Sequence, residues 1–554
     1  MAKKKKKNST TKYVIGAAAV AVVAFGAYSV LNNGNKKSDN KEGQAIRWTF
    51  PTDISTLDIS KNTDTYSGTI IGNTGSNLLR IDADGKVVPE LAKEITHSKD
   101  GLSYEVTLRD GLKWSDGSEL TAEDFVYTWQ RIVDPKTASE YSYLASGVKN
   151  ADDILAGKGK VEDLGVKADG NKITFTLERP VPQFEYLLTF TNFMPQSKKF
   201  VEKEGDKYGT TSDKQLYSGP YKFEGWNGTN GSFKLVKNEN YWDKDSVKAP
   251  EIDFEVVKQP ENAVQMYKQN KLDFAPIGTP DLYNANKNEK GVKYVAEATT
   301  AYIQYLQNGK NKALSNTKIR QALNLTTNRK ELVDQVTAGV SKPATGLVPA
   351  ELAKTSDGKD LAEFVKQPYT YNVDEAKKLW DEGLKEIGES SVKLTITSDA
   401  DNPAAKTTVE YLSGAWENAL PGLKIEQKFV PFKQRLQDST NHNFDMVISL
   451  WGGDYPEGST FYSLFPTGAP YNNGEFSNKA YDESFKLATT KDALNDEARN
   501  NDYKDVEKAL YDEANINPLY WRGRYALENP EVKDVIFAST GLNTDFKYAY
   551  RESK

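Results

Sequence analysis

The pattern of apolar and polar residues predicts three short β-strands in the first third of the chain, two of them by strict alternation. Residues 103–108 (SYEVTL) alternate, and residues 172–177 (KITFTL) repeat the pattern. A two-residue period is typical of a strand with one buried face. Residues 46–58 open with a further apolar strand pattern and then become rich in turn-forming residues.

An amphipathic helix is predicted between the strands at 103–108 and 172–177. Thr121 can cap its first turn, which also carries two acidic residues, and Asp134-Pro135 ends it. The apolar residues recur at a helical spacing, which indicates one face packed on the core. That face consists of Phe125, Trp129, Ile132 and Val133.

The region 393–451 alternates between strand and helix patterns. Strands are predicted at 393–397, 424–430 and 445–451, with helices near 404–419 and 432–439. This order predicts a parallel sheet flanked by helices. Ligands gather at the carboxyl ends of such strands, so the residues after Leu450 are candidates for a binding site.

Those residues are Trp451-Gly452-Gly453-Asp454. Residues 446–450 before them are predicted to be buried on both faces of the sheet. The two glycines let a second backbone approach closely, and main-chain groups there can pair with an added extended strand. Asp454 can pair with a cationic group, or it can hydrogen-bond the backbone of its own tight turn.

Two further helices are predicted. One covers residues 317–338 and ends at Gly339, a suitable residue after a helix end. The other covers residues 373–387, begins after Asn372 and ends at Gly388.

Residues 1–43 form a basic start, an apolar segment and a polar linker. Five lysines, 3–7, precede the uncharged stretch Tyr13 to Leu31, whose nineteen residues cover ~28 Å as a helix. The positive-inside rule predicts that the rest of the chain lies outside the cell membrane. Two interpretations stay open: a cleaved signal peptide or a retained anchor. The absence of cysteine excludes an acylated lipoprotein.

Charge and composition exclude several classes of function. The net charge is −6, and residues 1–41 contribute +8, so the remainder carries −14, the difference between the two. An acidic body argues against nucleic acid as a partner and favours cationic or neutral ligands. The chain has no cysteine and two histidines, which excludes disulfides and multi-histidine metal sites. We find no GxSxG, HExxH or phosphate-binding loop, and we predict neither catalysis nor a cofactor.

Residues 89–138 carry an ordered set of short motifs. They are Pro89-Glu90-Leu91-Ala92, Leu112-Lys113-Trp114-Ser115-Asp116-Gly117, Thr121-Ala122-Glu123-Asp124-Phe125 and Asp134-Pro135. The chain thereby resembles the family 5 extracellular solute-binding proteins, the oligopeptide- and dipeptide-binding receptors of ABC importers. The resemblance continues through Ser218-Gly219-Pro220-Tyr221 to Trp451-Gly452-Gly453-Asp454, and so covers nearly the whole body.

The resemblance implies an α/β fold of the periplasmic-binding-protein type, with two hinged sheet-based lobes and a third inserted lobe. With 554 residues the chain also exceeds the size of one core. We expect lobe I to consist of 44–75, 200–299 and 522–554, inserted lobe II of 76–199, and lobe III of 300–521.

The resemblance also implies site residues. In the family, the aspartate that matches Asp454 pairs with the ligand's α-ammonium, and the matching tryptophan lies near the side-chain pockets. We predict a binding site along Leu450, Trp451, Gly452, Gly453 and Asp454. Tyr141 matches an aromatic residue of the cleft, and Thr63 and Thr65 match a segment that contacts the ligand backbone.

The expected function is capture of oligopeptides outside the cell and delivery to an ABC permease, by a monomer on a Gram-positive surface. Some family members that hold short peptides place an arginine three residues before the tryptophan, where this chain has Ile448. We therefore expect longer or more varied peptides. Nutrient uptake and pheromone sensing stay open as alternatives.

Overall fold

The computed structural model describes residues 43–83, 85–295 and 297–552. The predicted apolar segment Tyr13 to Leu31 lies outside these residues. Within the described ranges, no helix combines the length and the apolar character that a membrane crossing requires.

The first sheet contains the predicted strand near residue 46. Strand β1 (Ile46–Phe50) pairs in parallel with β10 (Glu251–Val256), which is followed by the antiparallel strands β9 (Ser232–Lys237) and β8 (Tyr221–Glu224). Helix α2 (Thr65–Thr74) packs near β8. The buried side chains of this part form one core around Trp48, which stacks on Phe274 at 4.1 Å between ring centroids.

A second sheet confirms the two alternating strands. It is antiparallel, in the order β4-β5-β7-β6, with bounds Ala92–His97, Ser103–Leu108, Lys172–Thr176 and Val166–Asp169. Helix α3 (Ala122–Val133) begins after Thr121 with a capping box to Asp124, as Ser/Thr-capped helices do. All four residues of its predicted core face are fully buried, which confirms the helix and its orientation.

The third sheet is mixed rather than wholly parallel. Its order is β14-β18-β13-β17-β15-β16. Strands β15 (Val392–Asp399), β16 (Leu423–Val430) and β17 (Met446–Gly452) run parallel, as predicted. Strand β13 (Thr299–Tyr305) pairs antiparallel with β17 on its other side, and β18 (Ile516–Trp521) and β14 (Lys342–Pro343) continue the antiparallel part. The pattern over 393–451 contains no information about these distant strands, so it did not predict them.

Helices cover this sheet, and one prediction for them was wrong. Helices α14 (Pro403–Ala419), α15 (Phe432–Thr440) and α13 (Val373–Ile387) match their predictions, and α13 begins at Asn372 and ends at Gly388. The single helix expected over 317–338 is instead two, α10 (Thr317–Leu325) and α11 (Arg329–Thr337). Asn328 causes the break, because its side chain accepts the backbone N–H of Glu331 and starts a new helix.

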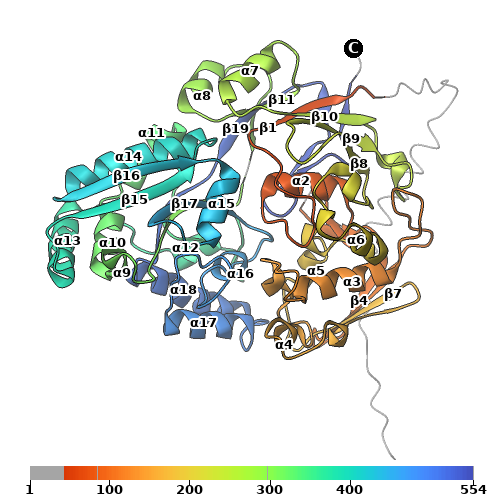
Figure 1. The fold of residues 1–554 in the computed structure, drawn as a ribbon, viewed down its shortest axis with the longest axis horizontal. Coiled ribbons are helices and arrows are strands. Elements are labelled where there is room, and N and C mark those ends of the chain that lie inside the picture. The colour runs from red at the N-terminus through yellow and green to blue at the C-terminus, as the bar shows by residue number, and fades with distance from the viewer. Residues whose placement is uncertain (1–42, 84, 296, 553–554) are drawn as a thin grey trace, which may run out of the picture.

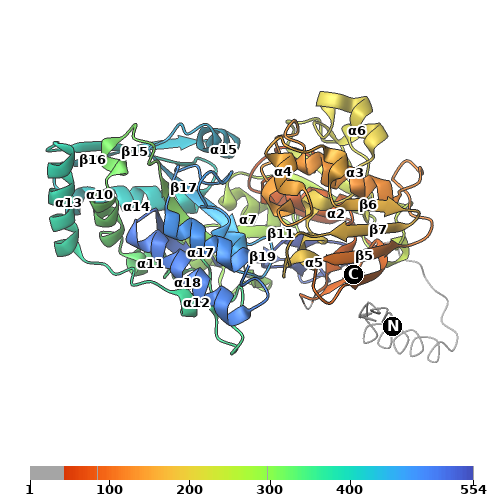
Figure 2. The same ribbon diagram turned by 90° about the horizontal axis from the view of Figure 1, so that it is seen from below.

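Figure 1 shows two bodies side by side, one built on the mixed sheet and one on the first two sheets, and Figure 2 shows the same separation from below. A small sheet, β11-β19-β12, joins them, with bounds Phe274–Ile277, Arg524–Glu528 and Val292–Val295. Short connections lead from β12 into β13 and from β18 into β19. The remaining longer helices are α7 (Pro260–Lys268), α17 (Lys479–Thr489) and α18 (Asp496–Asp512).

Candidate functional site

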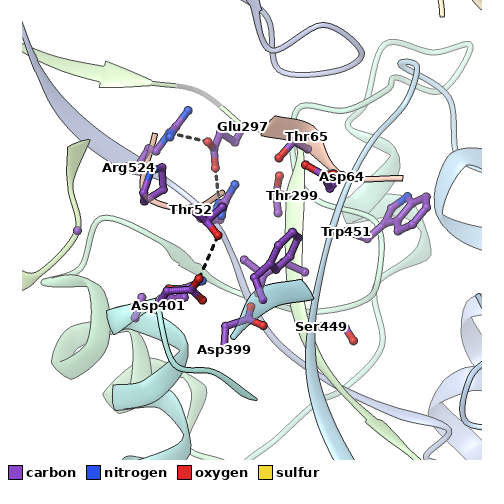
Figure 3. A pocket seen from close by; sticks show the side chains of 18 of the residues that line it. Thr52, Asp64, Thr65, Glu297, Thr299, Asp399, Asp401, Ser449, Trp451 and Arg524 are labelled. Atoms are coloured by element: carbon purple, nitrogen blue, oxygen red, sulfur yellow. Dashed lines mark hydrogen bonds and ion pairs between the residues drawn. The ribbon is translucent and has the colours of Figure 1, made fainter. Parts of the chain in front are cut away.

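A cavity of about 320 Å³ lies against the mixed sheet and reaches across to the body that contains β1. Strand β17 contributes Ser449, Leu450, Trp451 and Gly452 to its wall, and β13 contributes Thr299, Tyr302 and Gln304. The opposite side is formed by Thr52, Thr63, Asp64 and Thr65, which precede or begin helix α2. Figure 3 shows Trp451 and Ser449 on one strand, with Thr65 and Asp64 facing them from another part of the chain.

The eight predicted site residues fall into two groups. Leu450, Trp451, Gly452, Thr63 and Thr65 line the cavity. Gly453, Asp454 and Tyr141 do not, but they are in contact directly behind this wall: Gly453 and Asp454 follow β17, and the hydroxyl of Tyr141 donates to Asp454 Oδ1 at 3.2 Å. The structure therefore brings Tyr141 and Asp454 together across 313 positions of sequence.

Asp454 is a buried carboxyl group, with 8% of its surface exposed. Its Oδ2 accepts a 3.3 Å hydrogen bond from the Thr460 hydroxyl, and that hydroxyl accepts the Asp454 backbone N–H at 2.8 Å. Over residues 43–552, apart from positions 84 and 296, no basic side chain forms an ion pair with it. Burial raises the pKa of Asp454 to about 7, although the hydrogen bonds from Tyr141 and Thr460 act in the opposite direction. A cationic ligand group would supply the missing charge partner.

One edge of β17 is open where it borders the cavity. Strand β15 pairs with β17 only at Met446 and Val447, whereas β13 pairs with it along its whole length. From Ile448 to Gly452, the described strands therefore leave the β15 side of β17 without a neighbour. An extended chain placed there gains main-chain hydrogen bonds without any requirement on its side chains.

The glycine that follows β17 is closely surrounded. A Cβ on Gly453 would lie 3.0 Å from Leu352 Cδ1 and 3.2 Å from Thr540 Cγ2. Its N–H donates to the carbonyl of Ala298 at 2.8 Å. A larger residue at this position would therefore need these side chains to shift.

Aromatic side chains from distant segments meet at Trp451. The ring of Tyr471 lies 4.7 Å from that of Trp451, and Tyr141 lies 5.8 Å from Tyr471 and 6.3 Å from Trp451, between ring centroids. The indole N–H of Trp451 donates to the Thr460 carbonyl at 2.9 Å, so the ring orientation is fixed. Sequence reasoning missed Tyr471, which lies between β17 and α17 in a stretch without periodicity.

Ion pairs on the cavity wall were also missed. Glu297 is bound by Arg522 and, at 2.5 Å, by Arg524, and Asp399 is bound by Arg435 at 2.9 Å. Burial acts to raise the pKa of Glu297, but the two guanidinium groups outweigh it and the pKa is lowered. No sequence signal marks these pairs, since charged residues are 27% of the chain.

Two further hydrogen bonds join the two bodies, one of them at the cavity. The Thr52 hydroxyl donates to Asp401 at 3.0 Å, which Figure 3 marks, and Arg179 donates to the Thr489 carbonyl. Together with the bond from Tyr141 to Asp454, these hydrogen bonds link the two bodies.

Comparison with known proteins gives consistent matches. Residues 86–473 match the family described as bacterial extracellular solute-binding proteins, family 5 middle. A dipeptide-binding protein of Lactococcus lactis subsp. cremoris is 46% identical over 541 residues, which are 96% of this chain and 98% of the relative.

Solved structures agree with this match. A structure of Listeria monocytogenes OppA bound to peptide superposes with a TM-score of 0.88 at 35% identity, covering 92% of this chain and all of the other. The pheromone receptor PrgZ, whose structure describes its mode of peptide binding, gives a TM-score of 0.87 at 31% identity with the same two coverages.

Proposed function

Because the chain belongs to the bacterial extracellular solute-binding proteins of family 5, we propose that it is a receptor that captures peptides and delivers them to an ABC-type importer. The observation that carries the proposal is the open edge of β17, which borders the cavity and ends two residues before the buried carboxyl group of Asp454. The peptide named in the Listeria monocytogenes structure and the name of the Lactococcus lactis relative support it.

Each site residue has a physical role in this proposal. The peptide main chain pairs with β17 along Leu450 to Gly452, and its α-ammonium forms an ion pair with Asp454. Trp451 and Tyr471 form the walls of a side-chain pocket, and Tyr141 packs against both rings from behind. Thr63 and Thr65 offer hydroxyl groups to the peptide from the facing side of the cavity.

Capture is coupled to closure between the lobes. We assign 44–75, 200–299 and 522–554 to lobe I, 76–199 to lobe II and 300–521 to lobe III. The short connections between β12 and β13 and between β18 and β19 then act as the hinge. All the proposed site residues belong to one chain, so a monomer suffices for binding.

Native mass spectrometry after incubation with a peptide mixture tests the function. We expect intact peptides to be retained with one-to-one stoichiometry and the mixture to stay uncleaved, because the proposed site holds ligands without reacting with them. Cleavage products made by the purified protein would instead indicate a peptidase.

Ligand length is a separate prediction. No arginine occupies position 448, and the open edge of β17 runs from Gly452 back to Ile448, away from Asp454, so peptides of four to six residues are expected to bind at least as tightly as dipeptides. Calorimetry with peptides of two to ten residues measures this. A strict preference for dipeptides, as the name of the Lactococcus lactis relative suggests for that protein, would contradict it.

We place the folded part outside the cell, as in the extracellular family to which it belongs. Residues 13–31 act either as a retained anchor or as a cleaved signal, since the chain has no cysteine for a lipid tether. The intact mass of the protein taken from the cell surface distinguishes the two.

A further inference from the structure

The charged side chains on the cavity wall are unevenly matched. Five carboxyl groups and three guanidinium groups line it. All three guanidinium groups are paired with acids of the same wall: Arg522 and Arg524 with Glu297, and Arg435 with Asp399. Two acids are thus the partners of all three basic side chains, and three carboxyl groups are left, so the wall carries five acidic against three basic groups.

Two of the remaining carboxyl groups have protein partners. Asp64 caps helix α2, accepting the backbone N–H groups of Tyr66 at 3.0 Å and Ser67 at 2.8 Å. Asp401 accepts the Thr52 hydroxyl at 3.0 Å. These bonds account for both side chains without any ligand.

The third carboxyl group, that of Glu140, differs from the other four. It is half-buried and lines the cavity, yet in the described part of the chain its side chain has neither an ion-pair partner nor a hydrogen-bond donor. Burial raises its pKa, so the surroundings disfavour the charge. A carboxylate at such a position is stabilised when a ligand supplies the opposite charge.

The position of Glu140 indicates which part of the ligand meets it. Its neighbour Tyr141 contacts both Asp454 and Tyr471, and Tyr471 also lines the cavity. The negative charge of Glu140 also acts on Tyr471. Glu140 therefore lies beside the aromatic pocket near the proposed amino end of the peptide.

We propose that Glu140 makes this receptor selective for peptides with a basic side chain, lysine or arginine, close to the amino end. The inference rests on the proposed function, because it assumes that the cavity binds peptides. It goes further by naming their chemical class: a lysine or arginine side chain supplies the cation that the wall lacks. The acidic body, with its charge of −14, attracts the same ligands over a longer range.

Pentaalanine and its single-substitution variants test the inference. Lysine or the uncharged isostere norleucine is placed at position 2, 3 or 4, and calorimetry gives Kd for the wild type, Glu140→Gln and Asp401→Asn. At one position, lysine is expected to bind about tenfold tighter than norleucine. Glu140→Gln should reduce that ratio to about twofold or less, with the affinity for pentaalanine unchanged, whereas Asp401→Asn should preserve the ratio.

Each contrary result has a distinct meaning. Equal affinities for lysine and norleucine at every position, or a lysine preference that survives in Glu140→Gln, would overturn the inference while peptide binding stands. If Glu140→Gln weakens every free-amino peptide equally, and amino-terminal acetylation does the same in the wild type, then Glu140 holds the α-ammonium and the inference is wrong. If the wild type binds no peptide, the proposed function fails and the inference fails with it.

Discussion

Replacing Asp454 with asparagine is expected to weaken peptide binding by about 100-fold, since removing one partner of a buried ion pair costs about 2–5 kcal/mol. Asparagine retains the shape of the side chain, so the loss of affinity measures the contribution of the charge.

The Asp454→Asn variant should also melt at a higher temperature than the wild type when ligand-free at pH 8. With a folded-state pKa of about 7, well above that of the unfolded chain, the ionised carboxylate destabilises the fold at pH 8.

A matched control is available in Glu507. It is fully buried, accepts the Leu347 N–H and the Tyr462 hydroxyl at 2.9 Å each, and has a pKa raised to about 7 by burial. It does not line the cavity. Glu507→Gln should therefore raise the melting temperature of the ligand-free protein at pH 8 and leave peptide affinity unchanged. Unchanged affinity in Asp454→Asn, measured by calorimetry, would remove Asp454 from the proposed site.

Peptide affinity is expected to fall about 50-fold between pH 7 and pH 5. Burial raises the pKa of Asp454 to about 7, so the carboxyl group gains its proton as the pH falls through this value. The protonated form cannot pair with an ammonium group, and at pH 5 only about 1% of the ligand-free protein is ionised at this position. Above about pH 8 the peptide's α-amino group loses its own proton, so affinity declines again.

Titration of Kd against pH, with heats compared in two buffers of different ionisation enthalpy, measures this effect. Proton release on binding near pH 6 is the expected signature, because the ligand stabilises the ionised form of Asp454. Asp454→Asn and an amino-terminally acetylated peptide should both flatten the acidic limb. A profile that is flat between pH 5 and pH 7 in the wild type would show that the ammonium group does not meet this carboxylate.

Local sequence patterns predicted individual elements well. Helix α13 has its capping residue Asn372 and its final Gly388 where expected, and β15 and β16 match their predicted ranges closely. Such features depend on neighbours within a few residues, so a short stretch of sequence contains the information that decides them. The break between α10 and α11 was missed although residues 326–331 (TTNRKE) contain no apolar residue, and the cap at Asn328 starts the second helix there.

The site was predictable only in part. The residues from Leu450 to Asp454 stand out by their order and their likeness to a family, and Leu450, Trp451 and Gly452 do line the cavity. Nothing in the sequence separates Tyr471 from the other 29 tyrosines, or Glu140 from the other acids. Their significance comes from which wall they lie on, and that depends on how lobes far apart in the sequence come together.

The sequence by itself predicted several of the strands and helices, established the acidic and cysteine-free character of the body, and gave a short list of candidate site residues headed by Asp454. Only the tertiary structure decided that β15 stops pairing with β17 at Val447, that Tyr141 reaches Asp454, and that Glu140 has no partner on the cavity wall. The physical reason is the distance along the chain over which each effect acts. Periodicity and capping act over a few residues, while burial, strand edges and charge pairing are properties of surfaces that meet only after folding.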